Sequence, residues 1–218
     1  FMITPSVHNQ VELAGRLLDA LKAAGVPRLV RLSAIGAEWE TPPIFVREHT
    51  ATEAQIAASG IPATVLRPNS FMTNFIQFTP PDPEGNIRLP LGDAGVSLID
   101  ARDVADVAAH VLTTDGHVGK AYTLTGPAPV TVGEVAATIA EVAGRPVTYV
   151  DMPEEAMRQG LLGFGLPQPM VDGMMDLWET NRSGATAFVT DAVQELTGRP
   201  GRSFAEFARD HAGAWRQA

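Results

Sequence analysis

Cysteine is absent from all 218 residues of the chain. Its absence excludes disulfide bonds and every zinc site built on thiolate ligands. The five histidines do not replace such ligands, because none of them stands in a metal-binding spacing such as H-E-x-x-H. We therefore expect no bound metal ion.

The sequence also lacks a hydrophobic run of membrane length and a signal peptide, so we expect no membrane contact and a cytoplasmic location. Basic residues are in the minority, with 16 Lys and Arg against 25 Asp and Glu and a formal net charge of -9. A protein that binds nucleic acid gathers positive charge to meet the phosphates, so direct contact with nucleic acid is not expected. An acidic surface can equally serve solubility alone.

Two sequence signatures of common enzyme classes are missing. No G-x-G-x-x-G turn joins a strand to a helix, and the glycine-rich run 160–165 follows a helical pattern and precedes Pro167. We expect that run to be a flexible break. G-x-S-x-G is absent as well, so Ser33 and His49 do not fit the pattern of a serine hydrolase.

Short apolar runs alternate with amphipathic segments through the first part of the chain. The expected strands are 1–4, 29–32, 63–66 and 121–124, and the expected helices are 9–24, 45–58 and one that begins at Asp100. This alternation favours a parallel sheet joined by right-handed crossovers. The expected fold class is therefore α/β, with a doubly wound parallel sheet.

Residues 79–100 interrupt the alternation. The apolar stretches 86–90 and 96–99 flank the turn-like segment Leu91–Gly95, which predicts a hairpin-like excursion. Just before it, residues 71–78 predict a short helix with an aromatic face. We expect this excursion to lie on the substrate side of the sheet.

Beyond residue 126 the patterns are mostly helical. Capping boxes begin at Thr131 and Ser203, and a short strand is expected at 147–150. The sequence therefore predicts two parts, a sheet-containing domain over residues 1–126 and a smaller, mainly helical region over residues 127–218.

Polar side chains follow two neighbouring strands at the points where they end. Ser33 follows the strand 29–32, Asn69 lies just beyond 63–66, and His49 belongs to the helix between them. The carboxyl ends of parallel strands meet at one edge, where α/β enzymes place their sites. Ser33 can equally cap a turn, and His49 can equally be a surface residue of its helix.

Four segments occur together, in this order, in one known family. They are residues 1–5, residues 23–36, Glu53 with residues 59–74, and residues 100–109. With them the chain resembles the NmrA-like branch of the atypical short-chain dehydrogenases/reductases, to which NADPH-dependent quinone reductases belong. The resemblance implies a Rossmann-type fold and NADP as the cofactor, with NAD as the alternative.

The resemblance also assigns residues to the cofactor. Thr4 and Pro5 would border the nucleotide, and Ser33 and Ala34 would lie beside the nicotinamide ribose. The wall of the nicotinamide would be formed by Pro68, Asn69, Ser70 and Phe71. These assignments carry the family pattern over to matching positions of this sequence.

The chain departs from the family pattern at the catalytic helix. Short-chain dehydrogenases resembling it carry Tyr-x-x-x-Lys there, and the matching positions are Phe45 and His49. Phenylalanine cannot transfer a proton. His49 can hold a ribose hydroxyl or act as an acid near neutral pH, which makes it, with Ser33, the candidate catalytic residue. Because a quinone can take its proton from solvent, the loss of the tyrosine does not exclude reduction.

Two functions follow from the resemblance. The first is an NAD(P)H-dependent reductase that transfers hydride to a small quinone or carbonyl acceptor. The alternative is a non-catalytic NAD(P)-binding redox sensor of the NmrA type. The resemblance makes 1–4 the fourth strand of the sheet, so we expect upstream residues, or the second chain of a homodimer, to cover its apolar edge.

Overall fold

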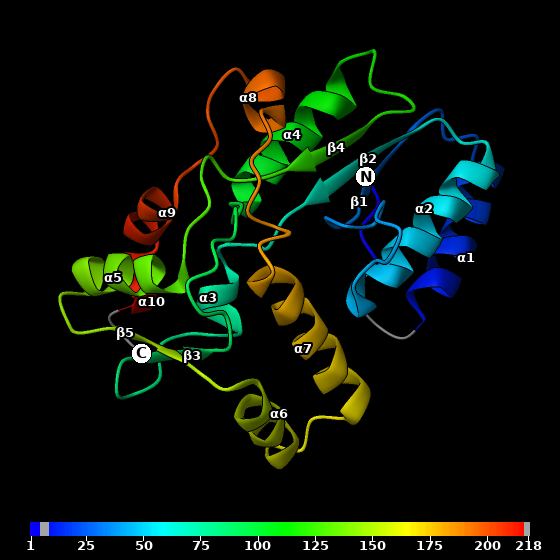
Figure 1. Ribbon diagram of the computed structural model, residues 1–218. Coiled ribbons are helices and arrows are strands. Elements are labelled where there is room, and N and C mark those ends of the chain that lie inside the picture. Colours follow the sequence, from blue (N-terminus) through cyan, green and yellow to red (C-terminus); the bar gives the residue numbers. More distant parts are fainter. Residues whose placement is uncertain (5–8, 216–218) are drawn as a thin grey trace.

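Parallel strands form the main sheet of the computed structural model, which describes residues 1–4 and 9–215 (Figure 1). Within these residues the sheet has the order β1-β2-β4. Its strands are β1 (Leu29–Leu32), β2 (Ala63–Pro68) and β4 (Ala121–Leu124). Leu29 pairs with Ala63, and Val65 pairs with Ala121. The predicted parallel α/β sheet is confirmed at these strands.

The expected strand 1–4 is reduced to a single parallel bridge between Met2 and Arg31. The amide of Met2 donates to the carbonyl of Val30, and the amide of Leu32 donates to the carbonyl of Met2. Met2 is buried, whereas the side chains of Phe1 and Ile3 are 53% and 59% exposed. The side chains of Phe1 and Ile3 therefore leave apolar surface exposed beside β1.

Successive strand residues point to opposite sides, so both faces of the sheet carry apolar side chains. Helices cover both of these faces. On one face lie α1 (Gln10–Ala23) and α2 (Arg47–Ser59), and on the other lie α4 (Ala101–Thr113) and α8 (Ala192–Thr197) (Figure 1). Leu29 packs in the hydrophobic core beneath α1 and α2, whereas its neighbour Val30 packs in a separate core beneath α4 and α8. Gly60 adopts a left-handed conformation with φ 74° and ends α2, as its position predicts.

The prediction of a hairpin within residues 79–100 is wrong. The strand β3 (Asn86–Leu89) instead pairs in parallel with β5 (Thr148–Asp151). The second apolar stretch, residues 96–99, pairs with two different segments. Val96 forms a bridge with Val130, and Ile99 forms a bridge with Phe71. A turn signal between two apolar stretches predicts local pairing, and it carries no information about partners some sixty residues away in the chain.

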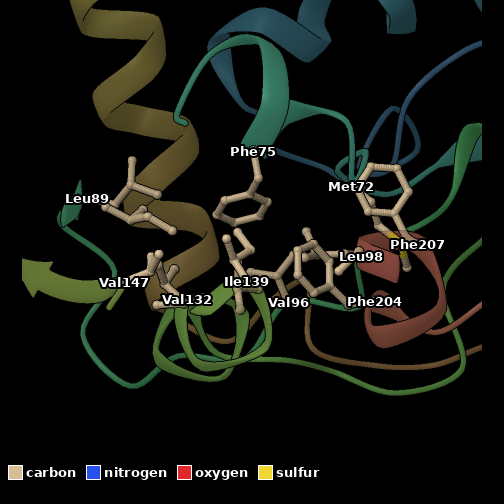
Figure 2. Packing of buried hydrophobic residues seen from close by; sticks show 14 of the residues in the cluster. Met72, Phe75, Leu89, Val96, Leu98, Val132, Ile139, Val147, Phe204 and Phe207 are labelled. Carbon is tan, nitrogen blue, oxygen red and sulfur yellow. The ribbon is translucent and has the colours of Figure 1, made fainter. Parts of the chain in front are cut away.

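A third core lies under the short helix α3 (Asn74–Gln77). It is formed with α5 (Val132–Ala143), α9 (Phe204–Asp210) and α10 (Ala212–Trp215). Figure 2 shows Phe75 pointing from α3 toward Ile139 of α5, and its ring meets that of Phe204 edge-on at 5.7 Å. The predicted capping boxes at Thr131 and Ser203 are both present. The helix that begins at Ser203 is divided at His211 into α9 and α10.

The helix pair α6 (Glu154–Gly163) and α7 (Gln168–Arg182) projects from this part of the fold (Figure 1). The break expected over the glycine-rich run 160–165 is shorter than predicted, because α6 extends to Gly163. Helix α7 contacts the 3-10 turn η1 (Ile44–Val46), where the amide of Ile44 donates to Asp176 at 2.6 Å. This contact places α7 beside the carboxyl ends of the strands.

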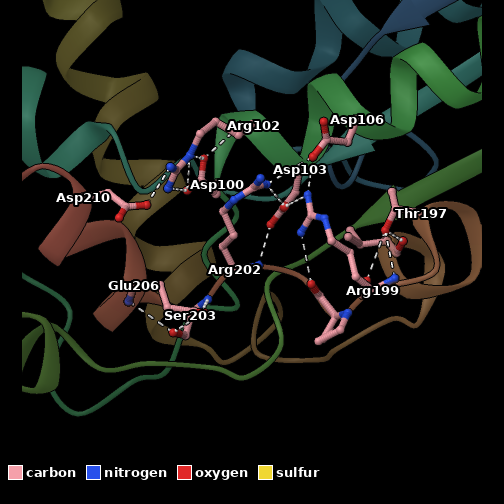
Figure 3. Close-up of polar contacts among 12 residues, drawn as sticks. Asp100, Arg102, Asp103, Asp106, Thr197, Arg199, Arg202, Ser203, Glu206 and Asp210 are labelled. Carbon is pink, nitrogen blue, oxygen red and sulfur yellow. Dashed lines mark hydrogen bonds and ion pairs between the residues drawn. The ribbon is translucent and has the colours of Figure 1, made fainter.

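An ion-pair network joins α4 to the segment that follows α8 (Figure 3). The fully buried carboxylate of Asp103 accepts from the backbone amide of Arg202 at 2.7 Å and pairs with the side chains of Arg199 and Arg202. Next to it, Arg102 bridges Asp100 and Asp210 at 2.6 and 2.7 Å. The network holds the C-terminal helices against the sheet-containing part.

None of the helices in the described part of the chain is long and apolar enough to span a membrane.

Candidate active site at the carboxyl ends of the strands

A cavity of about 350 Å³ opens where β1 and β2 end. Its floor is formed by the residues that follow these strands, and η1, α2 and α7 supply its walls. Such a volume lies within the range of pockets that bind small molecules. The edge of a parallel sheet at the carboxyl ends of its strands is also where α/β proteins bind their ligands.

The structure gathers the predicted site residues in this one cavity. The predicted residues that line it are Thr4, Ser33, Ala34, His49, Pro68, Asn69, Ser70 and Phe71. Pro5 lies outside the described residues. Backbone bonds set the strand ends side by side, since the amide of Ser33 donates to the carbonyl of Leu66 and that of Asn69 donates to Leu124.

Asn69 is buried, and its amide group is engaged within the protein. Its Nδ2 donates to the carbonyl of Thr186 at 2.9 Å, and its Oδ1 accepts from the amide of Ser70 at 2.7 Å. Asn69 therefore ties the end of β2 to the loop after α7. It shapes the cavity wall through these bonds.

Ser33 lies against Glu53, a carboxylate on the buried face of α2. The Ser33 hydroxyl donates to Oε1 of Glu53 at 2.5 Å. Arg67 of β2 binds the same carboxylate twice, and its Nε also lies 3.5 Å from Glu38. The hydrogen bonds to Glu53 raise the pKa of Arg67. Because its proton is directed to Glu53, Ser33 offers a ligand its oxygen lone pairs as acceptors.

His49 lies beside Arg31, which is fully buried on β1. Nη2 of Arg31 lies 3.5 Å from Nδ1 of His49. A guanidinium only donates, so Nδ1 is the acceptor and the ring proton belongs on Nε2. Burial, followed by the charge of Arg31, lowers the pKa of His49 to about 4 against an opposing effect of Glu53. The imidazole is therefore neutral at neutral pH.

Sequence reasoning missed three charged residues of this site, Arg31, Glu53 and Arg67. Arg31 carried a usable signal, because it interrupts an apolar strand of a parallel sheet that is covered on both faces. An arginine in that position is buried and needs a partner. Glu53 lies four residues after His49 and so shares its helix face, which was a second signal.

A smaller cavity of about 220 Å³ lies among α3, β3, α6 and α7. Met157, Leu161, Met174 and Trp178 give it apolar walls, and Arg88 lies at it. Its lining residues are different from those of the larger cavity, although α7 contributes to both. Within residues 1–4 and 9–215, no three His, Asp or Glu side chains are grouped so that they could hold a metal ion.

The sequence model of the NmrA-like family matches residues 1–205. The chain is 40% identical to an NAD(P)H azoreductase of Xenophilus azovorans, over 99% of this chain and 76% of that protein. It is 38% identical to a (4-alkanoyl-5-oxo-2,5-dihydrofuran-3-yl)methyl phosphate reductase of Streptomyces griseus, over 92% and 71% of the two chains.

Among solved structures, the chain is similar to an NADPH-dependent quinone oxidoreductase of Escherichia coli complexed with NADPH. The TM-score is 0.84 at 28% identity, and the match covers 94% of this chain and 72% of that one.

Proposed function

Because the chain belongs to the NmrA-like family, we propose that it reduces a small quinone or carbonyl acceptor with hydride from NADPH. An NAD(P)H-dependent oxidoreductase is the general class of this chain and of the reductases it matches. The observation that carries the finer proposal is the single cavity that collects Thr4, Ser33, His49 and residues 68–71 at the strand ends. NAD is the alternative cofactor.

The residues of the cavity fit a nicotinamide ring with its ribose. Pro68 and Phe71 offer flat apolar surface for the ring. Thr4 also lines the cavity, and its buried hydroxyl oxygen has no hydrogen-bond partner among the described residues. The bound cofactor supplies the hydride, and the protein supplies its position.

His49 takes the place of the family's lysine. With a pKa of about 4 it carries no charge at neutral pH, so its Nε2–H is available as a hydrogen-bond donor. We propose that this group holds a hydroxyl of the nicotinamide ribose. The lowered pKa favours that role over the alternative of an acid near neutral pH. Ser33 is proposed to accept a hydrogen bond from the same ribose.

Phe45 takes the place of the tyrosine that donates a proton in related enzymes. It lines the cavity and is 42% exposed. Since phenylalanine cannot transfer a proton, the acceptor is proposed to take its proton from water. A quinone suits this chemistry, because its reduced oxygens are readily protonated by solvent. The side chain of Phe45 excludes water from part of the wall and orients flat ligands.

Two further expectations stay proposals. Residues 1–126 are proposed to hold the cofactor, and residues 127–218 are proposed to face the acceptor together with the excursion 79–100. The exposed side chains of Phe1 and Ile3 are proposed to be covered by a second copy of the chain, since an open apolar edge favours association. Light scattering at increasing concentration tests the second point.

Steady-state oxidation of NADPH, followed by its absorbance, tests the function. A panel of benzoquinones, naphthoquinones and azo compounds supplies the acceptors, and NADH replaces NADPH in a parallel series. Turnover with any acceptor supports the reductase. Tight NADPH binding with no oxidation across the panel favours the redox sensor, which the loss of the tyrosine at Phe45 makes the second candidate.

Two variants locate the chemistry. Phe45→Tyr is expected to leave quinone reduction within about twofold of the unchanged protein, because solvent already supplies the proton. His49→Ala is expected to weaken NADPH binding by about fivefold, the equivalent of one ordinary hydrogen bond. Unchanged affinity and rate in His49→Ala would remove His49 from the site.

A further inference from the structure

Arg31 is a charged residue in a position that normally holds an apolar one. It belongs to β1, and its side chain has no exposed surface. Strand alternation places it on the same face as Leu29, the face covered by α1 and α2. A guanidinium in such a position loses its hydration, which is costly unless partners replace the lost water.

The partners of Arg31 do not offset that cost as a buried ion pair would. Among the described residues, the side chain of Arg31 forms hydrogen bonds only to the carbonyl of Met2 and to His49, both at 3.5 Å, and its Nε has no partner. No carboxylate lies within ion-pairing distance of it among these residues, since Glu53 pairs with Arg67 instead. Burial accordingly lowers the pKa of Arg31 to about 10. Stability alone therefore does not explain an arginine here.

His49 is the one side chain that Arg31 binds within the described residues. It stands on α2, directly over β1, and lines the larger cavity. An isolated imidazole exchanges its proton between Nδ1 and Nε2, and only one of the two forms donates from Nε2. A cation that only donates, placed at Nδ1, selects the form with the proton on Nε2.

We propose that Arg31 is a positioning residue for the cofactor site: it donates to Nδ1 of His49 and so holds the imidazole in the form that offers Nε2–H to the ligand. This rests on the proposed role of His49 toward the nicotinamide ribose. Arg31 thus acts from behind the site and touches no ligand. Its charge also opposes protonation of His49, which keeps the ring neutral and its orientation fixed.

The arrangement gives the arginine a role that a neutral residue of similar length cannot fill. A methionine in its place would occupy much of the volume but leave Nδ1 of His49 without a donor. A lysine would keep the charge and one donor, without the planar guanidinium. The variants Arg31→Met and Arg31→Lys therefore separate packing from positioning.

The test is nitrogen NMR of the histidine side chains in the full-length protein labelled at histidine, without cofactor. The His49 signals are identified by their loss in His49→Gln. In the unchanged protein we expect one form, with the proton on Nε2. Arg31→Met is expected to give a mixture of both forms, and Arg31→Lys is expected to retain mostly the Nε2–H form.

Arg28→Met is the matched control. Arg28 binds the carbonyls of Leu112 and Thr114, which end α4, and it makes no recorded contact with His49. Its replacement is expected to leave the His49 signals unchanged. A His49 protonated on Nδ1 in the unchanged protein would overturn the inference, whatever the Arg31 variants show. An unaltered Nε2–H form in folded Arg31→Met would overturn it as well.

Cofactor kinetics separate this inference from the proposed function. We expect Arg31→Met to raise the KM for NADPH about fivefold, as the loss of one oriented hydrogen bond would, with kcat changed much less. If the unchanged protein neither binds nor oxidises NADPH, the proposed function fails, and the NMR result still decides what Arg31 does to His49. A third outcome is that NADPH binds and Arg31→Met shifts the protonation form of His49 while the KM for NADPH stays the same. In that case His49 does not hold the ribose, and Arg31 does not position a cofactor.

Discussion

Arg67 holds Glu53 through two hydrogen bonds, one from Nε to Oε1 at 3.1 Å and one from Nη2 to Oε2 at 2.6 Å. The pair joins β2 to α2, and Ser33 at the end of β1 donates to the same carboxylate. One side chain of α2 therefore connects both strands whose ends form the cavity. We infer that Glu53 keeps the floor of the site in shape.

Replacing Glu53 with glutamine tests this connection. The side chains of Glu53 and Arg67 are only 14% and 17% exposed, so the arginine would keep its charge with little water to solvate it. We expect a loss of about 2–3 kcal/mol in the free energy of unfolding. Urea titration followed by circular dichroism measures it.

The control is Glu12→Gln on α1. Glu12 and Arg16 form a pair whose side chains are 59% and 74% exposed, so its removal is expected to change stability by less than about 0.5 kcal/mol. Equal effects of the two substitutions would show that the Glu53 carboxylate does not hold the strand ends.

The lowered pKa of His49 predicts a pH dependence of stability. Its folded value of about 4 lies below the ordinary value of 6.5, so the unfolded chain takes up the proton first as the pH falls. Stability is therefore lost between about pH 7 and pH 4, by about 2–3 kcal/mol from this group. His49→Gln should lack that part of the loss.

The measurement is urea unfolding of both proteins at a series of pH values across this window. Groups that do not interact with His49 contribute equally to the two proteins, so the difference between the curves reports His49 together with its coupling to Glu53. Curves that fall in parallel would mean that His49 is as readily protonated in the folded protein as in the unfolded chain.

Gly173 on α7 makes room for Phe45. A Cβ added at Gly173 would overlap Cε1 of the phenylalanine ring, so Gly173→Ala must displace the ring or the helix. We expect a loss of about 1–3 kcal/mol in stability and a change in KM for the acceptor, because Phe45 lines the cavity. Thermal unfolding and acceptor titration measure the two effects.

Gly160 on α6 provides the matched control. A Cβ there meets nothing within 4 Å, so Gly160→Ala is expected to stabilise the protein by up to about 1 kcal/mol through helix propensity. A Gly173→Ala protein that is also stabilised, with an unchanged KM, would contradict the close contact with Phe45.

Asp103 is the buried centre of the ion-pair network in Figure 3. Asp103→Asn removes the charge that Arg199 and Arg202 share, and we expect a loss of about 3 kcal/mol. Because the network holds the segment before α9, hydrogen exchange should rise first in α9. Exchange measured by mass spectrometry follows this directly.

Asp106→Asn is the comparison for that network. The Asp106 side chain is 46% exposed although it pairs with the same arginines, so solvent replaces much of what is lost. We expect a loss below about 1 kcal/mol and little change in α9. If Asp106→Asn speeds exchange in α9 and Asp103→Asn does not, the exposed Asp106 holds the segment before α9, and the buried Asp103 does not.

Local patterns determined most of the elements of this protein. Hydrophobic periodicity predicted the helices α1, α4 and α5, and Gly60 and the capping box at Thr131 marked where helices end or begin. These signals work because the interactions behind them lie within a few residues of chain. The positions of Ser33 and Asn69 at strand ends predicted that they would share one edge, and both line the cavity.

Pairings between distant segments were beyond the reach of those signals. The stretch at Asn86–Leu89 finds its partner at Thr148–Asp151, although a turn with an apolar stretch close behind it predicted a hairpin. The contribution of α7 to the cavity was equally hidden, since residues such as Leu177 and Thr180 come from a helix far along the chain. For both β3 and α7 many partners in the chain are possible, and the packing of the whole chain decides which of them is used.

The sequence by itself determined a parallel α/β sheet, the polar residues at its strand ends, and the positions of Phe45 and His49 in the segment between β1 and β2. The tertiary structure alone decided the electrostatics of that histidine. His49 is neutral because α2 folds over β1 and buries it beside Arg31. A pKa depends on the distance to charges and to water, and folding sets both of those distances.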